Sequence, residues 1–482
     1  MKMVYDVAVI GAGVIGSMIA MELSHYNIRS VVVEKFNDVA MGTTKANSAI
    51  VHAGFDAVPG TLKAKLNVEG TALMPEYCKR LHVPFKNTGS VVVAFSDEQM
   101  KTVQALYDRG VQNGVKDMEI IDEAKLREIE PHISNEAKGA LYAKTAGIVC
   151  PYQLAIASAE NAVLNGTDIK LNYNVKKIDF DENEKIFTLS NGEEEVKAKF
   201  VINAAGIFSG KVANMIGDDS VNITYRKGEY MLMDKAMNYL ANTVIFQCPT
   251  EMGKGVLVTN TVDGNLLVGP SSLDIAYNTE DLSTNSEVLD SVFVSAIKSV
   301  PELNMRNVIT SFAGIRAHDN SNDFIIGPSK ANGAFINVAG IESPGLSAAP
   351  AIGVCVKDIL LDIMGGAELK ENYEPSRKAP VRFNELSNEE RKALIEKDSR
   401  YGRIICRCET VTEGEILDAI HSPIPATDVD AVKRRTRAGM GRCQGGFCGS
   451  KVVELIAREN GKELDDITKF GGNSKLLVGK TK

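Results

Sequence analysis

The N-terminal segment follows a pattern of apolar runs separated by small residues. Residues 5–10 form an apolar run rich in β-branched side chains, and Gly-Ala-Gly-Val-Ile-Gly occupies positions 11–16. A helix is predicted over residues 17–23, and residues 30–34 form a second apolar strand that ends in a carboxylate. Strand, glycine-rich turn, helix and strand in this order are typical of a dinucleotide-binding βαβ unit.

Each of the three glycines in this turn is expected to have a steric role. Gly11 can adopt the backbone conformation of the tight turn, Gly13 lets a pyrophosphate approach the main chain, and Gly16 lets helix and strand pack closely. The phosphates would bind at the helix N-terminus, where unpaired N–H groups favour negative charge. Glu34, at the end of the second strand, would accept hydrogen bonds from the ribose and repel an NADP-type phosphate. The position of the motif near the N-terminus favours FAD over NAD.

Beyond this unit the pattern of apolar positions changes twice. Buried strands that run into small-residue turns are expected again at residues 200–203 and 334–340, as in a doubly wound sheet that returns to its cofactor. Residues 97–130 have the pattern of polar helices joined by turns. Residues 223 to about 312 have the pattern of short alternating strands, which predicts an antiparallel sheet that would bind the substrate.

Composition and charge limit the classes of function. A chain of 482 residues is too long for a single core, so two or three domains are expected. The net charge of −8 argues against nonspecific binding of nucleic acid. The charge is uneven, because residues 400–482 hold 15 Lys and Arg against 11 Asp and Glu. Such a basic segment could steer an acidic partner or balance a local anionic centre.

The hydropathy pattern gives no indication of a membrane segment. The first strand begins by Val4, which leaves no room for a signal peptide. No apolar run approaches the roughly 18 residues of a membrane-spanning helix. We therefore expect a cytoplasmic protein without a transmembrane segment of its own, which would associate with a membrane only through a partner.

The eight cysteines fall into two groups. Four are scattered singly and are expected to be small buried residues: Cys78, Cys150, Cys248 and Cys355. The other four form a C-x-C pair and, after a long intervening segment, a C-x4-C pair: Cys406, Cys408, Cys443 and Cys448. Two close pairs of thiolates indicate a metal centre. Structural zinc usually has two to four residues between paired cysteines, so the C-x-C pair favours an iron–sulfur cluster, with zinc or a redox dithiol as alternatives.

The cysteine spacing, followed by a capping box at residues 412–415, resembles the bacterioferritin-associated-ferredoxin-like domain. The resemblance implies a [2Fe-2S] cluster held by the four clustered cysteines. The basic residues 433–437 and Arg442 would then offset the negative charge of the cluster. The alternative is that this run forms a solvated surface.

Residues 1–365 resemble the D-amino-acid-oxidase-like family of FAD-dependent oxidoreductases, in particular its glycerol-3-phosphate and L-2-hydroxyglutarate dehydrogenase branches. The segments that carry the resemblance are residues 47–54, 59–65, 226–230, 264–270, 314–317 and 323–328. The resemblance implies that FAD is contacted by Gly11, Gly13, Gly16, Glu34, Thr43, Thr44, Ser48, Val175, Gly206, Gly340 and Leu346. The hydroxyglutarate branch usually has His and Gly where this chain has Ala46 and Ala49, so the substrate stays open between the branches.

The family also implies that His52 and Arg316 lie near the reacting face of the flavin. Arginine is suited to bidentate capture of a phosphate ester or a 2-hydroxy acid, and histidine can accept the proton of the hydroxyl. We favour His52 over His318 as the base, because His318 opens a polar loop that would face solvent. A core histidine and a structural salt bridge are the alternative interpretations of His52 and Arg316. Lys65 and Lys254 could add positive charge, although solvated lysines are the simpler interpretation.

The combined prediction is an FAD-dependent glycerol-3-phosphate dehydrogenase of anaerobic type. Hydride would pass from substrate C2 to flavin N5, and the [2Fe-2S] cluster would pass electrons to a second flavoprotein or a membrane-associated subunit. Alternatives are an L-2-hydroxyglutarate or other 2-hydroxy-acid dehydrogenase, an amine or amino-acid dehydrogenase, and a non-catalytic electron-transfer or redox-sensing module.

The predicted fold class is α/β. A Rossmann-like FAD-binding domain would carry an inserted antiparallel-sheet substrate domain, and a small helical iron–sulfur domain would follow. The expected limits are 1–85, 146–220 and 311–365 for the FAD-binding domain, 86–145 and 221–310 for the substrate domain, 366–400 for a linker, and 401–482 for the cluster domain.

Overall fold

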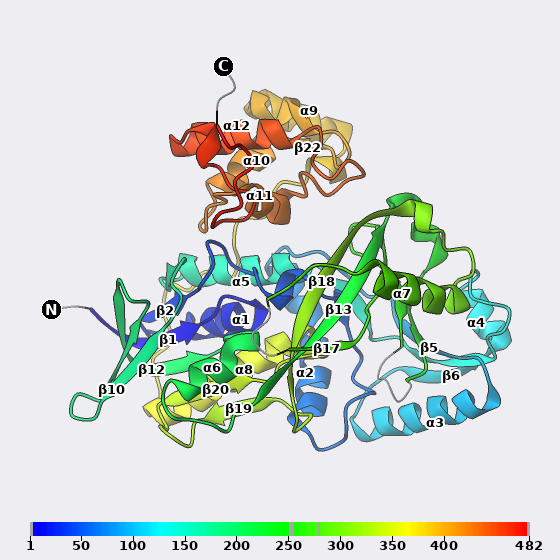
Figure 1. The fold of residues 1–482 in the computed structure, drawn as a ribbon, viewed down its shortest axis with the longest axis horizontal. Coiled ribbons are helices and arrows are strands. Elements are labelled where there is room, and N and C mark those ends of the chain that lie inside the picture. The colour runs from blue at the N-terminus through cyan, green and yellow to red at the C-terminus, as the bar shows by residue number, and fades with distance from the viewer. Residues whose placement is uncertain (1–2, 250–254, 277–279, 480–482) are drawn as a thin grey trace.

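Figure 1 shows the fold as a computed structural model, which describes residues 3–249, 255–276 and 280–479. Two large sheets make up most of the chain, and a C-terminal group of helices lies beside α5 and one end of the β13–β18 pair. The α/β architecture predicted from the sequence is therefore confirmed.

The first sheet is built around a parallel core that begins with the N-terminal strand. Its parallel strands are β1 (Val4–Ile10), β2 (Ser30–Val33), β9 (Asp168–Lys170), β12 (Glu195–Asn203) and β20 (Phe335–Ala339). Antiparallel strands extend it: β10 (Lys177–Asp181), β11 (Ile186–Ser190) and β19 (Ile325–Pro328). The βαβ unit predicted at the N-terminus is thus confirmed.

Helices cover both faces of this sheet. On one face α1, α5 and α8 pack together around a continuous apolar core, because α1 is buried along almost its whole length. The bounds are α1 (Val14–Leu23), α5 (Pro151–Leu164), α8 (Gly345–Met364), α2 (Leu62–Arg80), which packs on α8, and α6 (Ser209–Asn214), which packs on β20. A third, small sheet has the strand order β3 (Ile50–Val51), β8 (Gly147–Val149) and β4 (Phe85–Lys86).

The second sheet contains nine strands and carries the predicted substrate-binding region. Its strands are β5 (Ser90–Ala94), β6 (Met118–Asp122), β7 (Gly139–Ala143), β13 (Ile223–Met233), β14 (Val244–Gln247), β15 (Leu257–Asn260), β16 (Leu266–Gly269), β17 (Leu273–Ile275) and β18 (Val308–Asp319). Its helices are α3 (Asp97–Gln112), α4 (Glu123–Ile129) and α7 (Ser286–Ser299). β13 and β18 pair antiparallel from Ile223 opposite Asp319 to Met233 opposite Val308.

Two local predictions in this region were wrong. β6 interrupts the segment expected to hold only helices, because its pairing with β7 across the sheet overrides the polar pattern. α7 occupies part of the segment expected to hold only strands, since Asn285 caps it and Val292 and Ala296 bury one helical face. The domain limits stay a prediction, and the one between residues 310 and 311 falls inside β18.

The C-terminal helices have a core of their own. This part contains α9 (Asn388–Lys397), β21 (Ile404–Cys406), β22 (Val411–Thr412), α10 (Glu413–Ile420), α11 (Val429–Thr436) and α12 (Gly449–Asn460). Ile416, Val432 and Ile456 are fully buried at its centre. The predicted capping box at residues 412–415 is confirmed, with Thr412 and Glu415 each binding the other's backbone N–H.

Candidate active site and cluster site

The glycine turn after β1 has the geometry that the sequence motif predicts. Gly11 has a φ of +102°, and a Cβ atom there would lie 2.6 Å from the carbonyl oxygen of Ala204. A Cβ atom on Gly16 would lie 1.9 Å from the carbonyl oxygen of Gly11. Gly13 is the N-cap of α1. Only glycine at Gly11 and Gly16 therefore allows the strand, turn and helix to pack this closely.

The carboxylate at the end of β2 reaches back to this turn. Glu34 is buried, and its two oxygens accept hydrogen bonds from the backbone N–H groups of Ala12 at 2.7 Å and Phe36 at 3.0 Å. Burial raises the pKa of Glu34 despite these hydrogen bonds. Thr44 Oγ1 accepts a hydrogen bond from Val14 N at 2.9 Å and so satisfies an N–H group in the first turn of α1.

The room for a cofactor is visible at the neighbouring glycine positions. Gly206, after β12, has a φ of +58° and no atom within 4 Å of where its Cβ would lie. A Cβ on Gly13 would approach only Thr44 Oγ1, at 3.3 Å. Gly340, with a φ of +65°, directly follows β20, but a Cβ there would lie 3.2 Å from Asp319 Cβ and so would not face open space. The open positions at Gly13 and Gly206 leave the main chain accessible to a ligand, so the residues present fit a dinucleotide.

The loop between β2 and β3 connects the two large sheets. Thr43 Oγ1 donates a hydrogen bond to the carbonyl oxygen of Ile315 on β18, at 2.6 Å. Ser48 Oγ lies 3.2 Å from the hydroxyl of Tyr230 on β13. The remaining predicted FAD contacts lie in the β9–β10 loop and in the first turn of α8: Val175 is buried and Leu346 is half-buried. Whether these residues touch FAD stays a prediction.

His52 lies beside the N-terminus of α8. Its backbone N–H donates to Ser347 Oγ at 2.8 Å, and its ring Nε2 lies 3.4 Å from Ser343 Oγ. The ring stacks against Phe246 with centroids 5.7 Å apart. Because α8 begins at Gly345, this histidine stands where the positive end of a helix dipole would favour negative charge on a bound group.

Arg316 projects from β18 and is only partly satisfied. Its Nη2 donates to the carbonyl oxygen of Ser271 at 3.1 Å, while its buried Nε has no hydrogen-bond partner. Among the residues that the structure describes, no carboxylate forms an ion pair with Arg316. The described residues therefore do not support the alternative interpretation of Arg316 as one partner of a structural salt bridge.

His318 lies two residues further along β18, so its side chain is on the same side of the strand as that of Arg316. Its Nδ1 is 3.0 Å from Glu342 Oε1, which also lies 3.1 Å from Lys63 Nζ. Burial favours the neutral carboxyl, but Lys63 and His318 outweigh it and lower the pKa of Glu342. The loop after His318 does reach solvent, since residues 320–322 are exposed. His318 itself lies on β18, which continues through Asp319, and its side chain is only 13% exposed.

Three residues of this region were missed from the sequence. Lys63, Glu342 and Tyr230 adjoin the predicted site residues, yet the ion pair between Lys63 and Glu342 spans 279 positions of the chain. Of the two lysines that were considered, Lys65 is exposed on α2 and Lys254 lies outside the described residues.

The four clustered cysteines lie together as two pairs. Cys408 Sγ is 3.9 Å from Cys443 Sγ. Interaction between the thiols of Cys406 and Cys448 lowers the pKa of Cys406 to about 6 and raises that of Cys448. Over residues 3–249, 255–276 and 280–479, no three His, Cys, Asp or Glu side chains are grouped as a site for a single ion. Two thiol pairs fit a two-iron cluster better, because each iron takes two thiolates.

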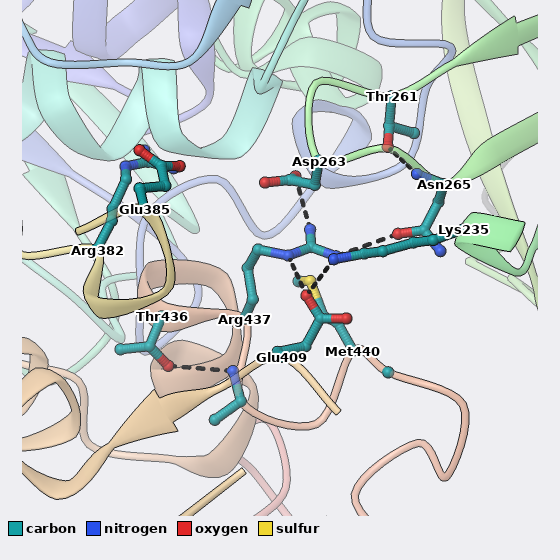
Figure 2. A network of polar contacts seen from close by, with 12 residues as sticks. Lys235, Thr261, Asp263, Asn265, Arg382, Glu385, Glu409, Thr436, Arg437 and Met440 are labelled. Atoms are coloured by element: carbon teal, nitrogen blue, oxygen red, sulfur yellow. Dashed lines mark hydrogen bonds and ion pairs between the residues drawn. The ribbon is translucent and has the colours of Figure 1, made fainter. Parts of the chain in front are cut away.

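The basic run beside the cysteines binds the rest of the protein. Arg435 Nη1 and Nη2 each lie 2.9 Å from the carboxylate of Asp38, and Arg434 pairs with the same carboxylate. Arg437 pairs with Asp263 at 2.6 Å, as Figure 2 shows. The alternative that this run forms a solvated surface does not hold for these three arginines, because they form buried ion pairs with Asp38 and Asp263. That the run offsets the charge of the cluster stays a prediction.

Comparison with known proteins decides the family. The sequence profile of the family described as FAD dependent oxidoreductase matches residues 6–359. The chain belongs to this family. A second profile, described as BFD-like [2Fe-2S] binding domain, matches residues 404–458 and includes all four clustered cysteines. The protein is an FAD-dependent oxidoreductase whose cofactors are FAD and a [2Fe-2S] cluster.

Individual relatives cover different parts of the chain. It is 51% identical to glycerol 3-phosphate dehydrogenase of Caloramator mitchellensis, over 99% of each chain. It is 33% identical to glycerol 3-phosphate oxidase of Mycoplasma genitalium, over 74% of this chain and 94% of that protein. Human mitochondrial L-2-hydroxyglutarate dehydrogenase is 26% identical, over 73% of this chain and 88% of that protein.

Solved structures support the same fold. Dithionite-reduced L-alpha-glycerophosphate oxidase from Mycoplasma pneumoniae with FAD bound superimposes with a TM-score of 0.74 at 30% identity, over 78% of this chain and 99% of that one. Glycerol-3-phosphate dehydrogenase from Bacillus halodurans complexed with FAD covers 96% of this chain and 92% of that one with a TM-score of 0.67, but at 17% identity it shows the fold alone. In the part of the chain that is described, no helix is long and apolar enough to cross a membrane.

Proposed function

We propose that this protein is a glycerol-3-phosphate dehydrogenase of the anaerobic type, which oxidises the CH–OH group at C2 to a ketone. The observation that carries the proposal is the half-buried Arg316, whose buried Nε has no hydrogen-bond partner and whose guanidinium has no carboxylate partner among the described residues. Such a group is suited to bind an anionic substrate. A relative with the corresponding printed name is 51% identical over 99% of this chain.

The two reacting groups of the substrate are assigned to different residues. Arg316 binds the phosphate through its fork of N–H donors and so presents C2 and its hydroxyl to the site. His52 accepts the proton of that hydroxyl at Nε2, the ring atom that faces Ser343 in the structure. When bound, FAD supplies the acceptor for the hydride that leaves C2. The alcohol loses a hydride and a proton, and dihydroxyacetone phosphate is the product.

The second histidine has a different part in this proposal. His318 Nδ1 is held by Glu342, and Lys63 pairs with the same carboxylate. A carboxylate at Nδ1 fixes the orientation of the imidazole ring. Because His318 lies on the same side of β18 as Arg316, we assign it to hold the substrate beside Arg316, as a positioning residue, and keep His52 as the proton acceptor.

The cofactor contacts are proposed from the turn geometry and the family. Gly11, Gly13 and Gly16 would leave the main chain open to the pyrophosphate, and Glu34 would bind the ribose in place of its present backbone donor. The other residues proposed to line the FAD site are Thr43, Thr44, Ser48, Val175, Gly206, Gly340 and Leu346. Cys406, Cys408, Cys443 and Cys448 would hold the cluster.

The onward path of the electrons also belongs to the proposal. The Mycoplasma genitalium oxidase matches 74% of this chain over 94% of its own length, so little of that protein is left to form a counterpart of the cluster domain. We infer that the reduced flavin gives its electrons to the cluster rather than directly to an oxidant in solution. The cluster would pass electrons to a second flavoprotein or a membrane-associated subunit, and a cytoplasmic protein would reach the membrane through that partner.

One alternative substrate has support of its own. L-2-hydroxyglutarate dehydrogenases match most of the flavin-binding part, and a guanidinium binds carboxylate as readily as phosphate. To separate the two, purified protein is incubated under nitrogen with an artificial electron acceptor and either sn-glycerol 3-phosphate or L-2-hydroxyglutarate. Formation of dihydroxyacetone phosphate at the higher kcat/KM supports the proposal. Formation of 2-oxoglutarate alone would assign the alternative instead.

A further inference from the structure

Both cysteine segments of the cluster domain are tied through side chains to the two-sheet part of the chain, residues 3–365, which is called the flavin-binding part below. Glu409, next to Cys408, accepts a hydrogen bond from Lys235 Nζ at 2.9 Å. Arg442, next to Cys443, donates from Nη2 to Asp234 Oδ1 at 3.0 Å. Lys235 and Asp234 directly follow β13, so the cluster loops lie against one end of the substrate sheet.

Arg437 contacts both Glu409, from the first of these attachments, and the turn between β15 and β16 (Figure 2). Its Nη1 donates to Asp263 Oδ2 at 2.6 Å and its Nη2 to Asn265 Oδ1 at 3.2 Å, both in the β15–β16 turn. Its Nε donates to Glu409 Oε2 at 2.8 Å, within the cluster domain. The side chain of Arg437 is 12% exposed and that of Glu409 is 3% exposed. One guanidinium, largely shielded from solvent, therefore bridges Glu409 beside the first cysteine pair and the β15–β16 turn.

The backbone conformation of Arg437 would favour glycine, which indicates that an arginine stands at this position because of its side-chain contacts. It is the C-cap of α11, with a φ of +71°, in the left-handed region where glycine is favoured. An arginine there costs conformational free energy that its side-chain contacts must offset. A glycine would satisfy the helix end better but would lose the bridge.

The loop that Arg437 begins also contacts the flavin-binding part directly. The hydroxyl of Tyr152, at the start of α5, lies 3.6 Å from the sulfur of Met440, which is three residues before Cys443. Tyr152 follows β8, where Val149 N donates to the carbonyl oxygen of Ala49 at 2.9 Å. Ala49 adjoins Ser48, one of the residues proposed to contact FAD. A short run of packed residues thus connects the proposed flavin site to the cluster loop.

We infer that Arg437 is a positioning residue that holds the cluster loops on the flavin-binding part and thereby sets the rate of electron transfer between the two centres. The inference rests on the proposed function, in which each alcohol oxidised releases two electrons and two protons. The cluster accepts one electron at a time, so two successive transfers per substrate cross this interface. Two molecules of an artificial one-electron acceptor in solution then take one electron each.

The first test measures docking rather than activity. Hydrogen–deuterium exchange is followed in the holoprotein for wild type, Arg437→Gly, and Asp263→Asn, which removes the charge on the other side of the interface. Arg437→Gly keeps the preferred residue at the end of α11, so the helix itself should form normally. The control is Arg458→Ala, because Arg458 pairs with Glu413 and Glu459, which both lie inside the cluster domain.

We expect faster exchange at residues 404–412 and 257–269 in both interface variants and not in the control. The docked state should become roughly 100-fold less favoured, the factor expected from losing one partner of a buried ion pair. FAD and iron content should be unchanged. Unaltered exchange in both interface variants would overturn the inference.

The second test measures the electron transfer. After anaerobic mixing with sn-glycerol 3-phosphate, the flavin band of Arg437→Gly should bleach at the wild-type rate, while cluster reduction should slow by about tenfold or more, because small displacements of reacting groups have effects of this order. Photochemical reduction of the flavin repeats the test without substrate. If the phosphate fails to bleach wild type, the proposed function fails, and the photochemical arm still tests Arg437. Equal rates of cluster reduction in wild type and Arg437→Gly would contradict the inference.

Discussion

Arg316 has an unsatisfied group that a folded protein rarely leaves buried. More than nine in ten buried polar groups find a partner, roughly speaking, yet the Nε of this guanidinium has none. His318, on the same side of β18, contacts the carboxylate of Glu342, and Lys63 forms an ion pair with the same carboxylate. A bound anion would complete the hydrogen bonding of Arg316 without disturbing those contacts.

Replacing Arg316 tests this account directly. Arg316→Ala should raise KM for glycerol 3-phosphate by roughly 30-fold or more, the 2–5 kcal/mol scale of breaking a buried charge pair. Arg316→Lys should recover part of the loss, because it keeps the charge but not the fork. Steady-state kinetics give KM, and flavin absorbance checks the fold. Exposed Arg306→Ala is the matched control. An unchanged KM in Arg316→Ala would remove this residue from the site.

Substitutions of the two histidines should affect different kinetic constants. His52→Gln should lower kcat by about 100-fold or more, the contribution of a general base, with KM little changed. His318→Gln should mainly raise KM, because it loosens the group that Glu342 holds. Rate measurements over a range of pH should also show that the fall in kcat on the acidic limb, where a protonated His52 cannot accept a proton, disappears in its variant. A larger loss of kcat in His318→Gln would exchange the two roles.

Elements built from local signals were predictable from the sequence. The strand, glycine turn and helix at the N-terminus follow from a local sequence pattern, and the packing of the turn requires glycine at Gly11 and Gly16. The capping boxes at Ser387 and Thr412 are likewise local. By contrast, β6 forms through its pairing with β7, and Arg437 is explained only by a carboxylate 174 positions away. Such contacts depend on the tertiary fold and cannot be predicted from a local sequence pattern.

The glycine turn gives a prediction at the scale of the element. In Gly16→Ala the new Cβ would lie 1.9 Å from the carbonyl oxygen of Gly11, so the helix must move away from the turn. We expect this variant to lose most of its FAD on purification, measured as flavin absorbance per chain. Gly333→Ala, where no atom lies within 4 Å of the Cβ position, should keep its full FAD content. Full FAD occupancy in Gly16→Ala would show that this packing is not needed.

At the scale of the whole molecule, the basic C-terminal part is docked on an acidic body through buried ion pairs. Asp38 is 1% exposed and pairs with Arg434 and Arg435, whose side chains are 5% and 6% exposed. Burial favours the neutral acid, but the two arginines outweigh it and lower the pKa of Asp38 to about 2. The uneven charge noted in the sequence thus serves contact within the chain.

This pair predicts a pH dependence with a definite sign. A carboxyl whose pKa is lowered by folding stabilises the protein above its ordinary pKa of 3.8, and the contribution is lost as the pH falls toward 2. Asp38→Asn should therefore lower the free energy of unfolding by about 3 kcal/mol, equally at pH 5 and pH 8. Denaturant unfolding at both pH values measures the deficit, with Asp97→Asn on the surface as control. A deficit that halves at pH 5 would contradict the assignment.

The central claim is that electrons from glycerol 3-phosphate enter the flavin and reach the cluster of the same chain. The most direct measurement is an anaerobic titration with sn-glycerol 3-phosphate, followed by flavin absorbance and by the electron paramagnetic resonance of the reduced cluster. The account predicts that the flavin band bleaches and the cluster signal appears in the same titration, while L-2-hydroxyglutarate produces neither. If dithionite reduces both centres and glycerol 3-phosphate reduces neither, the claim is contradicted.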